Sequence, residues 1–334
     1  MSNARFKVTF AGPLVSFQDA GRTGHMRFGV PASGPMDRFA FTAAHTMLGN
    51  PPDGTAIEVS LGGLVLECTE GEVTCALAGG GFAMTAAGAD AVGWQVVTVR
   101  KGDRITLRAG PWGSWSYLTF AGQIVAEQWL SHTATHTLSG LGGGALSSGG
   151  RFDVKDTATR PTRVGRYDCP EIARPLSDAR IVIGPQEQHF TPGAVDALIT
   201  SPYQMTEAFD RMGVRLDGPL LPLGNALSIP SEPVLRGSIQ VAGDGVPVVL
   251  LADHQTTGGY PKIATVLSRD TDRLAQLRAG ATIRFRAVSA PEAITLARQD
   301  HEIRQAALTT LATPRATLDQ RLMQANLISG VTDT

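Results

Sequence analysis

The sequence predicts a mainly β protein with a few helices, and two features favour this fold class. Of 334 residues, 38 are glycine and 20 are proline, which suits many short strands and turns better than long helices. Short runs that alternate apolar and polar residues also recur along the chain, separated by glycine-containing turns. The length allows about two domains, each with a sizeable core.

The first half combines such strands with one helix. Residues 6–10, which end at Phe10, alternate in polarity and indicate a half-buried opening strand. Asp37 is a candidate N-cap for a helix that Gly49 ends, because the apolar residues between them recur at helical spacing. From residue 57 to 120, strands follow one another at turn spacing, which is typical of an all-β barrel or sandwich.

Composition divides the chain near its middle. Glycine and serine are frequent from residue 140 to 150, and a stretch with proline and arginine follows as far as Pro175. We therefore expect a first domain over residues 1–150, a linker over 151–177, a second domain over 178–290, and a C-terminal helix and tail over 291–334.

Two helices are expected late in the chain. Asp270 or Thr271 is a candidate cap for a short helix that Gly280 ends. Ser289 and Glu292 form a capping box, which opens a longer helix rich in alanine, arginine and glutamate.

Charge and cysteine content exclude several classes of protein. The 29 basic and 30 acidic residues give a formal net charge of -1, which provides no electrostatic footprint for nucleic acid or an anionic membrane surface. Without a signal peptide or a membrane-length apolar segment, we expect a cytoplasmic protein. The cysteines Cys68, Cys75 and Cys169 are odd in number and lack C-x-x-C spacing, which favours reduced thiols over a disulfide framework or a zinc site.

The densest polar segment follows an apolar run at residues 246–251. Residues 253–264 carry a carboxylate, an imidazole, a carboxamide, hydroxyls, a phenol and an ammonium, with glycines that allow close approach to a ligand. Such a loop, held by a rigid sheet, is typical of a binding site. The alternative is a turn whose side chains satisfy local backbone groups. A second polar loop at residues 18–25 adds an amide, an acid, a guanidinium and an imidazole.

A metal site is not expected. His132 and His136 have the i, i+4 spacing of a metal pair, but the threonines around them make a helix doubtful. No glutamate completes a zincin motif, so we predict no metal.

Several signatures occur in order between residues 14 and 290. They are Gln18-Asp19 with Gly21-Arg22 and Gly24, Gly29-Val30-Pro31 with Gly34-Pro35-Met36-Asp37, Gly49-Asn50-Pro51, Arg211-Met212-Gly213 with Arg215, Gly237-Ser238-Ile239-Gln240, and residues 253–264. With them the chain resembles the allophanate hydrolase subunit 2 family, also called the biotin-dependent carboxyltransferase-like family. That family includes the C subunit of bacterial ATP-dependent 5-oxoprolinase.

The resemblance implies two cyclophilin-like β-barrel subdomains in tandem. It also implies partners, namely the companion 5-oxoprolinase subunits A and B, one of them similar to allophanate hydrolase subunit 1. Some related sequences are fused into urea carboxylase, where this region belongs to the carboxyltransferase domain.

The chain departs from the family pattern at several points. Position 254 is His where Arg is expected, Pro233 stands where Gly is usual, and residues 131–134 read Ser-His-Thr-Ala. A histidine is a weaker and pH-dependent substitute for an arginine as an anion ligand. A changed substrate is one consequence to test.

The leading hypothesis is a subunit of an ATP-dependent enzyme that opens 5-oxoproline to glutamate, a small-molecule amide substrate. We assign Lys262 and Arg22 to anionic oxygens, Gln255 with Thr256 to the amide, and Asp253 or His254 to proton transfer. The candidate catalytic residues are Asp253, His254, Gln255 and Lys262, and the candidate substrate-binding residues are Gln18, Asp19, Arg22, Arg211, Gln240, Thr256, Thr257, Gly258, Gly259 and Tyr260.

Two alternatives come from other functional classes. One is carboxyl transfer to a urea-like or amide nitrogen, in which biotin would come from a partner protein, because this chain has no Met-Lys-Met sequence. The other is a non-catalytic regulatory subunit. In any of these, Arg211 and Glu232 could form a buried structural ion pair. ATP is expected only in the complex, with no assigned site, because neither glycine run in this chain is a P-loop.

Overall fold

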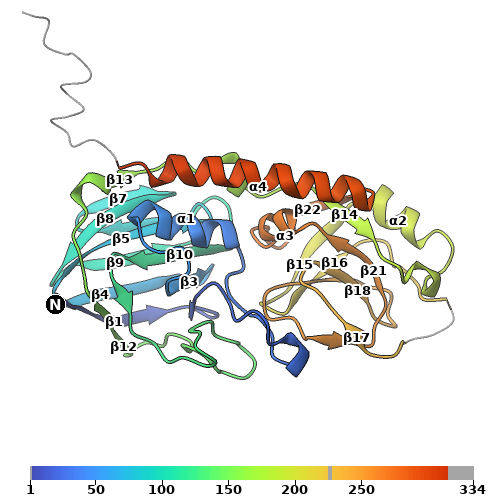
Figure 1. The fold of residues 1–334 in the computed structure, drawn as a ribbon, viewed down its shortest axis with the longest axis horizontal. Coiled ribbons are helices and arrows are strands. Elements are labelled where there is room, and N and C mark those ends of the chain that lie inside the picture. Colours follow the sequence, from blue (N-terminus) through green and yellow to red (C-terminus); the bar gives the residue numbers. More distant parts are fainter. Residues whose placement is uncertain (1, 225–227, 315–334) are drawn as a thin grey trace, which may run out of the picture.

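The computed structural model describes residues 2–224 and 228–314, and this part of the chain is mainly β (Figure 1). Its α-helices are α1 (Arg38–Leu48), α2 (Ala194–Thr200), α3 (Ser268–Leu274) and α4 (Ala290–Ala312). Short 3-10 helices are η1 (Met26–Phe28), η2 (Pro161–Arg163), η3 (Glu171–Ala173) and η4 (Glu187–His189). The predicted fold class is confirmed.

The first half consists of two sheets that enclose one core. One sheet has the order β11 (Gln123–Ile124), β12 (Arg151–Lys155), β1 (Ala4–Ala11), β4 (Leu64–Glu70), β9 (Arg104–Arg108), β6 (Ala83–Ala86) and β7 (Ala89–Val92). The other has the order β13 (Gly165–Arg166), β8 (Gln95–Arg100), β5 (Glu72–Gly79), β10 (Trp115–Phe120), β3 (Ala56–Ser60) and β2 (Ser16–Gln18). Phe6 and Phe120, from opposite sheets, lie 4.8 Å apart between ring centroids. Both β12 and β13 fall within the stretch predicted as a linker.

The second half is a closed barrel. Its order is β14 (Asp178–Ile183), β21 (Lys262–Val266), β18 (Ser238–Val241), β19 (Pro247–Leu250), β16 (Gly213–Asp217), β15 (Tyr203–Phe209) and β22 (Thr282–Ala287), and a two-stranded sheet of β17 (Glu232–Pro233) and β20 (Thr257–Gly258) lies apart from it. Parallel pairing of β14 with β22 contributes to the closure. The second half is thus the expected barrel.

Most predicted helix boundaries hold. Asp37 caps α1 by accepting a hydrogen bond from the Ala40 amide, and Gly49 ends it at φ 71°. In contrast, α3 begins at Ser268 and ends at Leu274, so the predicted cap at Asp270 or Thr271 and the predicted end at Gly280 are both wrong. Asp270 lies in the first turn, where its carboxylate accepts two 2.7 Å bonds from the Arg180 side chain. Because Arg180 is 90 residues away from Asp270, the local sequence pattern could not predict this partner.

The opening strand differs from its simple alternation at one end. Phe6 and Val8 are buried, but Phe10 is 49% exposed. A register shift between Val8 and Phe10 in the pairing with β4 inserts an extra residue and turns Phe10 outward.

Helix α4 runs along both halves (Figure 1). Ser289 accepts a hydrogen bond from the Glu292 amide, which confirms the predicted N-terminal cap. Asp300 on this helix binds Arg180 of the barrel at 3.0 Å, while Leu311 is buried in the core of the first half. The helix therefore fastens the two halves together. The predicted tail beyond residue 314 lies outside the described residues.

Two further properties bear on function. In the described residues, no helix combines the length and apolar character needed to span a membrane. The three cysteines are free, and burial raises the pKa of the Cys75 thiol to about 12.

Candidate functional site

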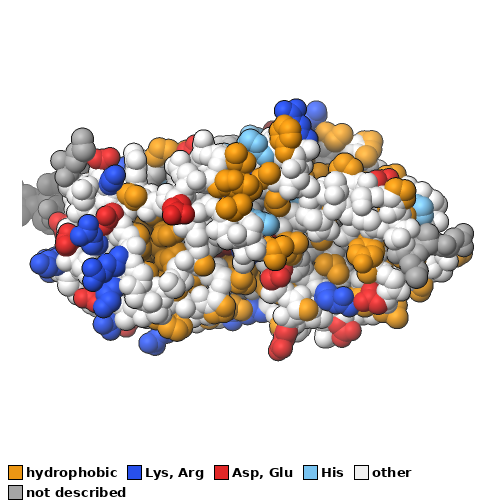
Figure 2. Space-filling model, turned by 90° about the horizontal axis from the view of Figure 1, so that it is seen from below, with side chains coloured by type: hydrophobic (Ala, Val, Ile, Leu, Met, Phe, Trp, Pro, Cys, Tyr) orange, Lys and Arg blue, Asp and Glu red, His pale blue; other side chains and the backbone are white. Residues whose placement is uncertain are grey.

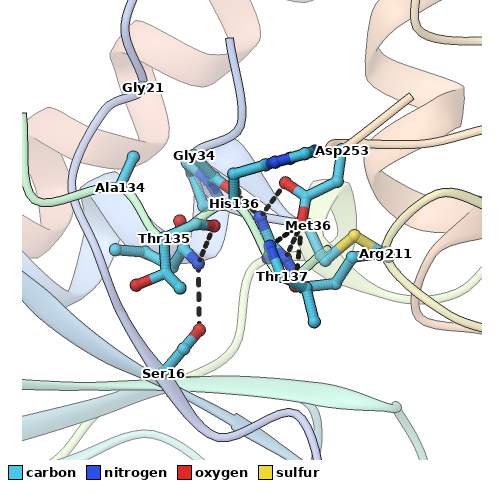
Figure 3. A network of polar contacts seen from close by, with 12 residues as sticks. Ser16, Gly21, Gly34, Met36, Ala134, Thr135, His136, Thr137, Arg211 and Asp253 are labelled. Atoms are coloured by element: carbon cyan, nitrogen blue, oxygen red, sulfur yellow. Dashed lines mark hydrogen bonds and ion pairs between the residues drawn. The ribbon is translucent and has the colours of Figure 1, made fainter. Parts of the chain in front are cut away.

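A buried ion cluster joins the two halves. Arg211 is 1% exposed and donates to both oxygens of Asp253, from Nε at 3.0 Å and from Nη2 at 2.9 Å (Figure 3). Its Nη1 forms an ion pair with Glu58, which is fully buried in β3 of the first half. Arg211 therefore holds one carboxylate from each half. The ion pair considered between Arg211 and Glu232 is therefore wrong. Arg211 pairs with Asp253 and Glu58, whereas Glu232 pairs with Lys262.

Asp253 is fully engaged and poorly placed for proton transfer. Its Oδ2 also accepts from the Thr137 amide at 3.0 Å and from the Thr137 hydroxyl at 2.8 Å. Burial opposes ionisation, but Arg211 and Thr137 outweigh it and hold the pKa of Asp253 below its usual value. The carboxylate is ionised and bound on both oxygens, which is typical of a structural group.

Arg22 is different because its guanidinium is buried and only partly satisfied. The side chain is 0% exposed, and its Nη2 donates to the Ala134 carbonyl. Its Nε and Nη1 have no hydrogen-bond partner among the described residues. Burial lowers the pKa of Arg22, while the charges of Asp19 and Asp253 oppose that shift. Buried donors left unpaired are costly, so they mark a place where a ligand can bind.

Gln18 presents an unpaired acceptor beside the same segment. Its Nε2 donates to the Thr135 carbonyl at 3.1 Å and to the Ser16 hydroxyl at 2.9 Å, and the carbonyl partner fixes which end is nitrogen. Its buried Oε1 finds no partner in the part of the chain that the structure describes. Arg22 binds the carbonyl of residue 134 and Gln18 that of residue 135, so the two side chains lie along one stretch of backbone.

Both carboxylate oxygens of Asp19 accept hydrogen bonds from neighbouring backbone amides. Its Oδ1 accepts from the Gly21 amide at 2.9 Å, and its Oδ2 accepts from the Thr133 amide at 2.7 Å. His132 Nδ1 lies 3.2 Å from the same Oδ2. His132 and His136 are not on a helix, and His136 contacts the Ser139 hydroxyl.

Other predicted residues line a separate pocket of about 600 Å³ on the barrel. Gln240, Gln255 and Tyr260 are among its walls, together with Phe209 and Arg215. Gln255 Nε2 donates to Gln240 Oε1 at 3.1 Å, and Gln240 Nε2 donates to the Tyr260 carbonyl at 3.1 Å. The pocket thus carries ordered carboxamide groups.

Lys262 belongs to a third group of side chains. Its Nζ lies 3.5 Å from Glu232 Oε2, and its amide donates to Gln186 Oε1 at 2.8 Å. Gln186 Nε2 also donates to Glu232. The Lys262 side chain is 14% exposed, whereas that of Glu232 is 53% exposed, so the ammonium stands near the surface with one carboxylate.

His254 is 5% exposed, and its Nδ1 contacts the Gln255 carbonyl at 2.6 Å. Burial, with the charge of Arg236 as a smaller cause, lowers the pKa of His254. It is therefore neutral at pH 7.

The glycine-containing part of the loop is held by backbone contacts. Thr257 and Gly258 form β20 and pair with β17, and the Thr256 and Gly259 carbonyls accept from Val234 and Ile229. A Cβ at Gly258 would lie 2.6 Å from Gln240 Nε2, so a side chain there would displace the Gln240 carboxamide.

The predicted residues thus fall into separate groups. The structure brings Gln18, Asp19 and Arg22 together near the Arg211–Asp253 pair, whereas Gln240, Gln255 and Tyr260 line the barrel pocket. Sequence reasoning missed Glu58 and Thr137, and also Trp129, whose ring centroid lies 4.7 Å from the Arg22 guanidinium carbon. Glu58 had one signal, a carboxylate in an otherwise apolar strand over residues 56–59.

Known proteins are similar to this chain over most of its length. Residues 28–287 match the family described as carboxyltransferase domain, subdomain A and B. The C subunit of 5-oxoprolinase from Escherichia coli K12 is 33% identical over 309 residues, which cover 89% of this chain and 95% of that protein. Urea amidolyase of Saccharomyces cerevisiae is 28% identical over 304 residues, 84% of this chain and 16% of that protein.

Solved structures share the fold. The crystal structure of TTHA0988 superposes with a TM-score of 0.75 at 31% identity, and the match covers 85% of this chain and 56% of that one. The chain therefore spans about half the length of TTHA0988. The Kluyveromyces lactis urea amidolyase has a TM-score of 0.79 at 24% identity, covering 96% of this chain and 21% of that one, which is a likeness of fold.

Proposed function

Because the chain belongs to the family of carboxyltransferase domains with subdomains A and B, we propose that it is one subunit of an ATP-dependent 5-oxoprolinase. The enzyme opens 5-oxoproline to glutamate with ATP and water, and companion subunits A and B complete it. The similarity to the 5-oxoprolinase C subunit over nearly the whole of both chains supports this assignment.

The observation that carries the proposal is the pair of unpaired groups on Arg22 and Gln18. The substrate 5-oxoproline has a carboxylate on the carbon next to its ring N–H. A guanidinium with two unpaired nitrogens suits a carboxylate, and a carboxamide oxygen suits a lactam N–H. Arg22 would bind the carboxylate, and Gln18 Oε1 would accept from the ring nitrogen.

The reaction needs activation of an unreactive amide. Nitrogen donation stabilises the lactam carbonyl, and phosphoryl transfer from ATP to its oxygen would turn that oxygen into a leaving group. Such a step depends on positioning and on stabilisation of developing negative charge. The amide would be held by Gln18 and not by Gln255 with Thr256, because Gln255 lines the separate barrel pocket. Lys262 would serve anionic oxygens that reach its own group of side chains.

The proton-transfer role falls to His254 and not to Asp253. Asp253 is ionised and engaged by Arg211 and Thr137. His254 is neutral, as a general base must be before it accepts a proton.

The companion subunits need a surface on which to bind. Hydrophobic side chains gather beside histidines near the middle of one face (Figure 2). Large exposed apolar residues include Phe28 of η1 at 67% and Leu138 at 80%. Exposed apolar groups of this kind suit a protein partner.

The test is ATP hydrolysis by this chain purified together with its companion subunits, with and without 5-oxoproline, while glutamate is measured. We expect hydrolysis that 5-oxoproline stimulates, with glutamate formed in equal amount. If correctly assembled subunits produce neither ADP nor glutamate in response to 5-oxoproline, the proposal is wrong.

A second candidate is carboxyl transfer to a urea-like or amide nitrogen, with biotin carried by a partner protein. The similarity to urea amidolyase favours it, and the carboxamides of Gln240 and Gln255 suit a ureido group. Streptavidin capture of a biotinylated partner, with bicarbonate-dependent ATP use on urea-like amides, would favour this candidate. A complex that assembles but shows neither activity would favour the regulatory alternative.

A further inference from the structure

The unpaired donors of Arg22 are closed off from solvent. The whole residue is 0% exposed, and its Nε and Nη1 touch neither the surface nor an acceptor on any described residue. A ligand carboxylate can therefore reach these nitrogens only after some part of the chain moves. The segment that covers the guanidinium identifies that part.

Trp129 covers one face of the Arg22 guanidinium. The guanidinium carbon lies 4.7 Å from the centroid of the indole ring, in a cation–π contact. Trp129 is itself only half-buried, while Arg22 beneath it is fully buried. The indole ring thus lies between the Arg22 guanidinium and solvent.

Trp129 stands at one end of a tight turn at the surface. The Trp129 amide donates to the His132 carbonyl at 2.9 Å, and the His132 amide donates to the Trp129 carbonyl at 3.1 Å. The two residues between them, Leu130 and Ser131, have φ of 51° and 65°. Two-residue hairpin turns with positive φ at both positions favour Asn-Gly, so leucine and serine make this closed turn strained.

Asp19 holds this turn in place. The Oδ2 atom of Asp19 accepts from the Thr133 amide at 2.7 Å and lies 3.2 Å from His132 Nδ1. Its other oxygen is bound to the Gly21 amide, next to Arg22. Asp19 therefore connects the end of the turn with the loop that carries Arg22.

We propose that the turn from Trp129 to His132 is a gate over the Arg22 site, held closed by the contact between His132 and Asp19. Its strained residues lower the cost of opening, and opening admits a small carboxylate to Arg22. Asp19 is then a positioning residue and does not touch substrate. The ligand class rests on the proposed function, but the gate itself rests on these contacts.

The gate can be tested without substrate by labelling with phenylglyoxal, which modifies accessible arginines. Labelling of Arg22 would be followed by peptide mass spectrometry on the folded full-length chain, with the exposed Arg215 as internal reference. We expect Arg22 to react more slowly than Arg215. Replacing His132 with Ala should accelerate Arg22 labelling about fivefold, because it removes one closing contact.

The opposite change should close the gate. The double substitution Leu130→Asn with Ser131→Gly relieves the strain and should slow Arg22 labelling about fivefold. The matched control is Ala87→Asn in the turn between β6 and β7, where Ala87 has φ 49° and Gly88 has φ 78°. This substitution relieves similar strain far from Arg22 and should leave its labelling rate unchanged.

Several outcomes would overturn the gate. They are Arg22 labelling as fast as Arg215 in the wild type, no labelling of Arg22 in either the wild type or the His132→Ala variant, and equal rates in all variants. Hydrolysis of 5-oxoproline by the complex is measured separately. A complex that is active while its gate variants label alike would reject the gate and keep the proposed function.

Discussion

Arg211 and Asp253 are joined by two parallel hydrogen bonds of 3.0 and 2.9 Å, buried where the two halves of the molecule meet. The two residues are in the second half, and both reach into the first: Arg211 to Glu58 and Asp253 to Thr137. A charge pair that is this well buried contributes little net stability compared with apolar packing, but loss of one partner leaves an uncompensated charge. The pair therefore fixes how the halves fit together.

Replacing Asp253 with Asn should destabilise the protein strongly. The free energy of unfolding should fall by about 3–5 kcal/mol, because Arg211 loses a buried counter-charge. Urea denaturation followed by fluorescence measures this change.

The control for Asp253 is Asp244→Asn. Asp244 pairs with Arg215 at 2.8 Å, but both side chains are nearly half exposed. Its loss should cost less than about 1 kcal/mol. Equal losses for the two variants would show that the buried pair has no special part in stability.

The pairing of Arg211 also shows what the sequence could not predict. Patterns of alternation and capping are local, and they correctly predicted the strand before residue 253, the helix capped by Asp37 and the helix capped by Ser289. The partners of Arg211 are 42 and 153 residues away. No local pattern distinguishes a buried carboxylate that closes such an interface from one that serves a substrate, so Asp253 was expected to be catalytic.

The two polar loops illustrate the same limit for the site. Their glycines and polar residues identified segments of interest, and Arg22 with Gln18 does retain unpaired polar atoms. Yet the loop from residue 253 to 264 divides its side chains between the interface, the barrel pocket and the surface. Successive side chains of this segment point to different sides of the barrel. The chemistry of each residue does not reveal to which side it points.

Asp37 should make stability depend on pH between about 4 and 6. Burial, together with the negative charge of Asp272, raises the pKa of Asp37 to about 6. The unfolded chain loses this proton near pH 3.8, so the folded state binds more protons between these values. As the pH rises through this window, ionisation of Asp37 should lower the free energy of unfolding by up to about 3 kcal/mol. Above the window this contribution should stay constant.

The Asp37→Asn variant isolates this effect. The amide oxygen can still cap the Ala40 amide, but the side chain no longer ionises. Free energies of unfolding would be measured from pH 4 to 7 for both proteins, and the difference between them should grow in favour of the variant as the pH rises. A constant difference across this range would mean that Asp37 keeps an ordinary pKa.

Lys262→Met should slow turnover in the assembled complex. If the ammonium stabilises an anionic oxygen in the transition state, its loss should lower kcat about 100-fold. Lys155→Met on β12 is the control, since Lys155 is exposed in the first half. Wild-type kcat in the Lys262 variant would remove this residue from the site.

Arg22→Met tests the proposed carboxylate contact. The guanidinium offers two unpaired nitrogen donors, and loss of such charge-assisted hydrogen bonds should reduce kcat/KM for 5-oxoproline by about 100-fold or more. Arg104→Met is the control, because Arg104 is exposed on β9 of the first half. The lactam 2-pyrrolidinone lacks the carboxylate, so its weaker turnover should be the same in wild type and the Arg22 variant. If the variant lost activity equally on both lactams, Arg22 would act on the fold or the shared chemistry and not on the carboxylate.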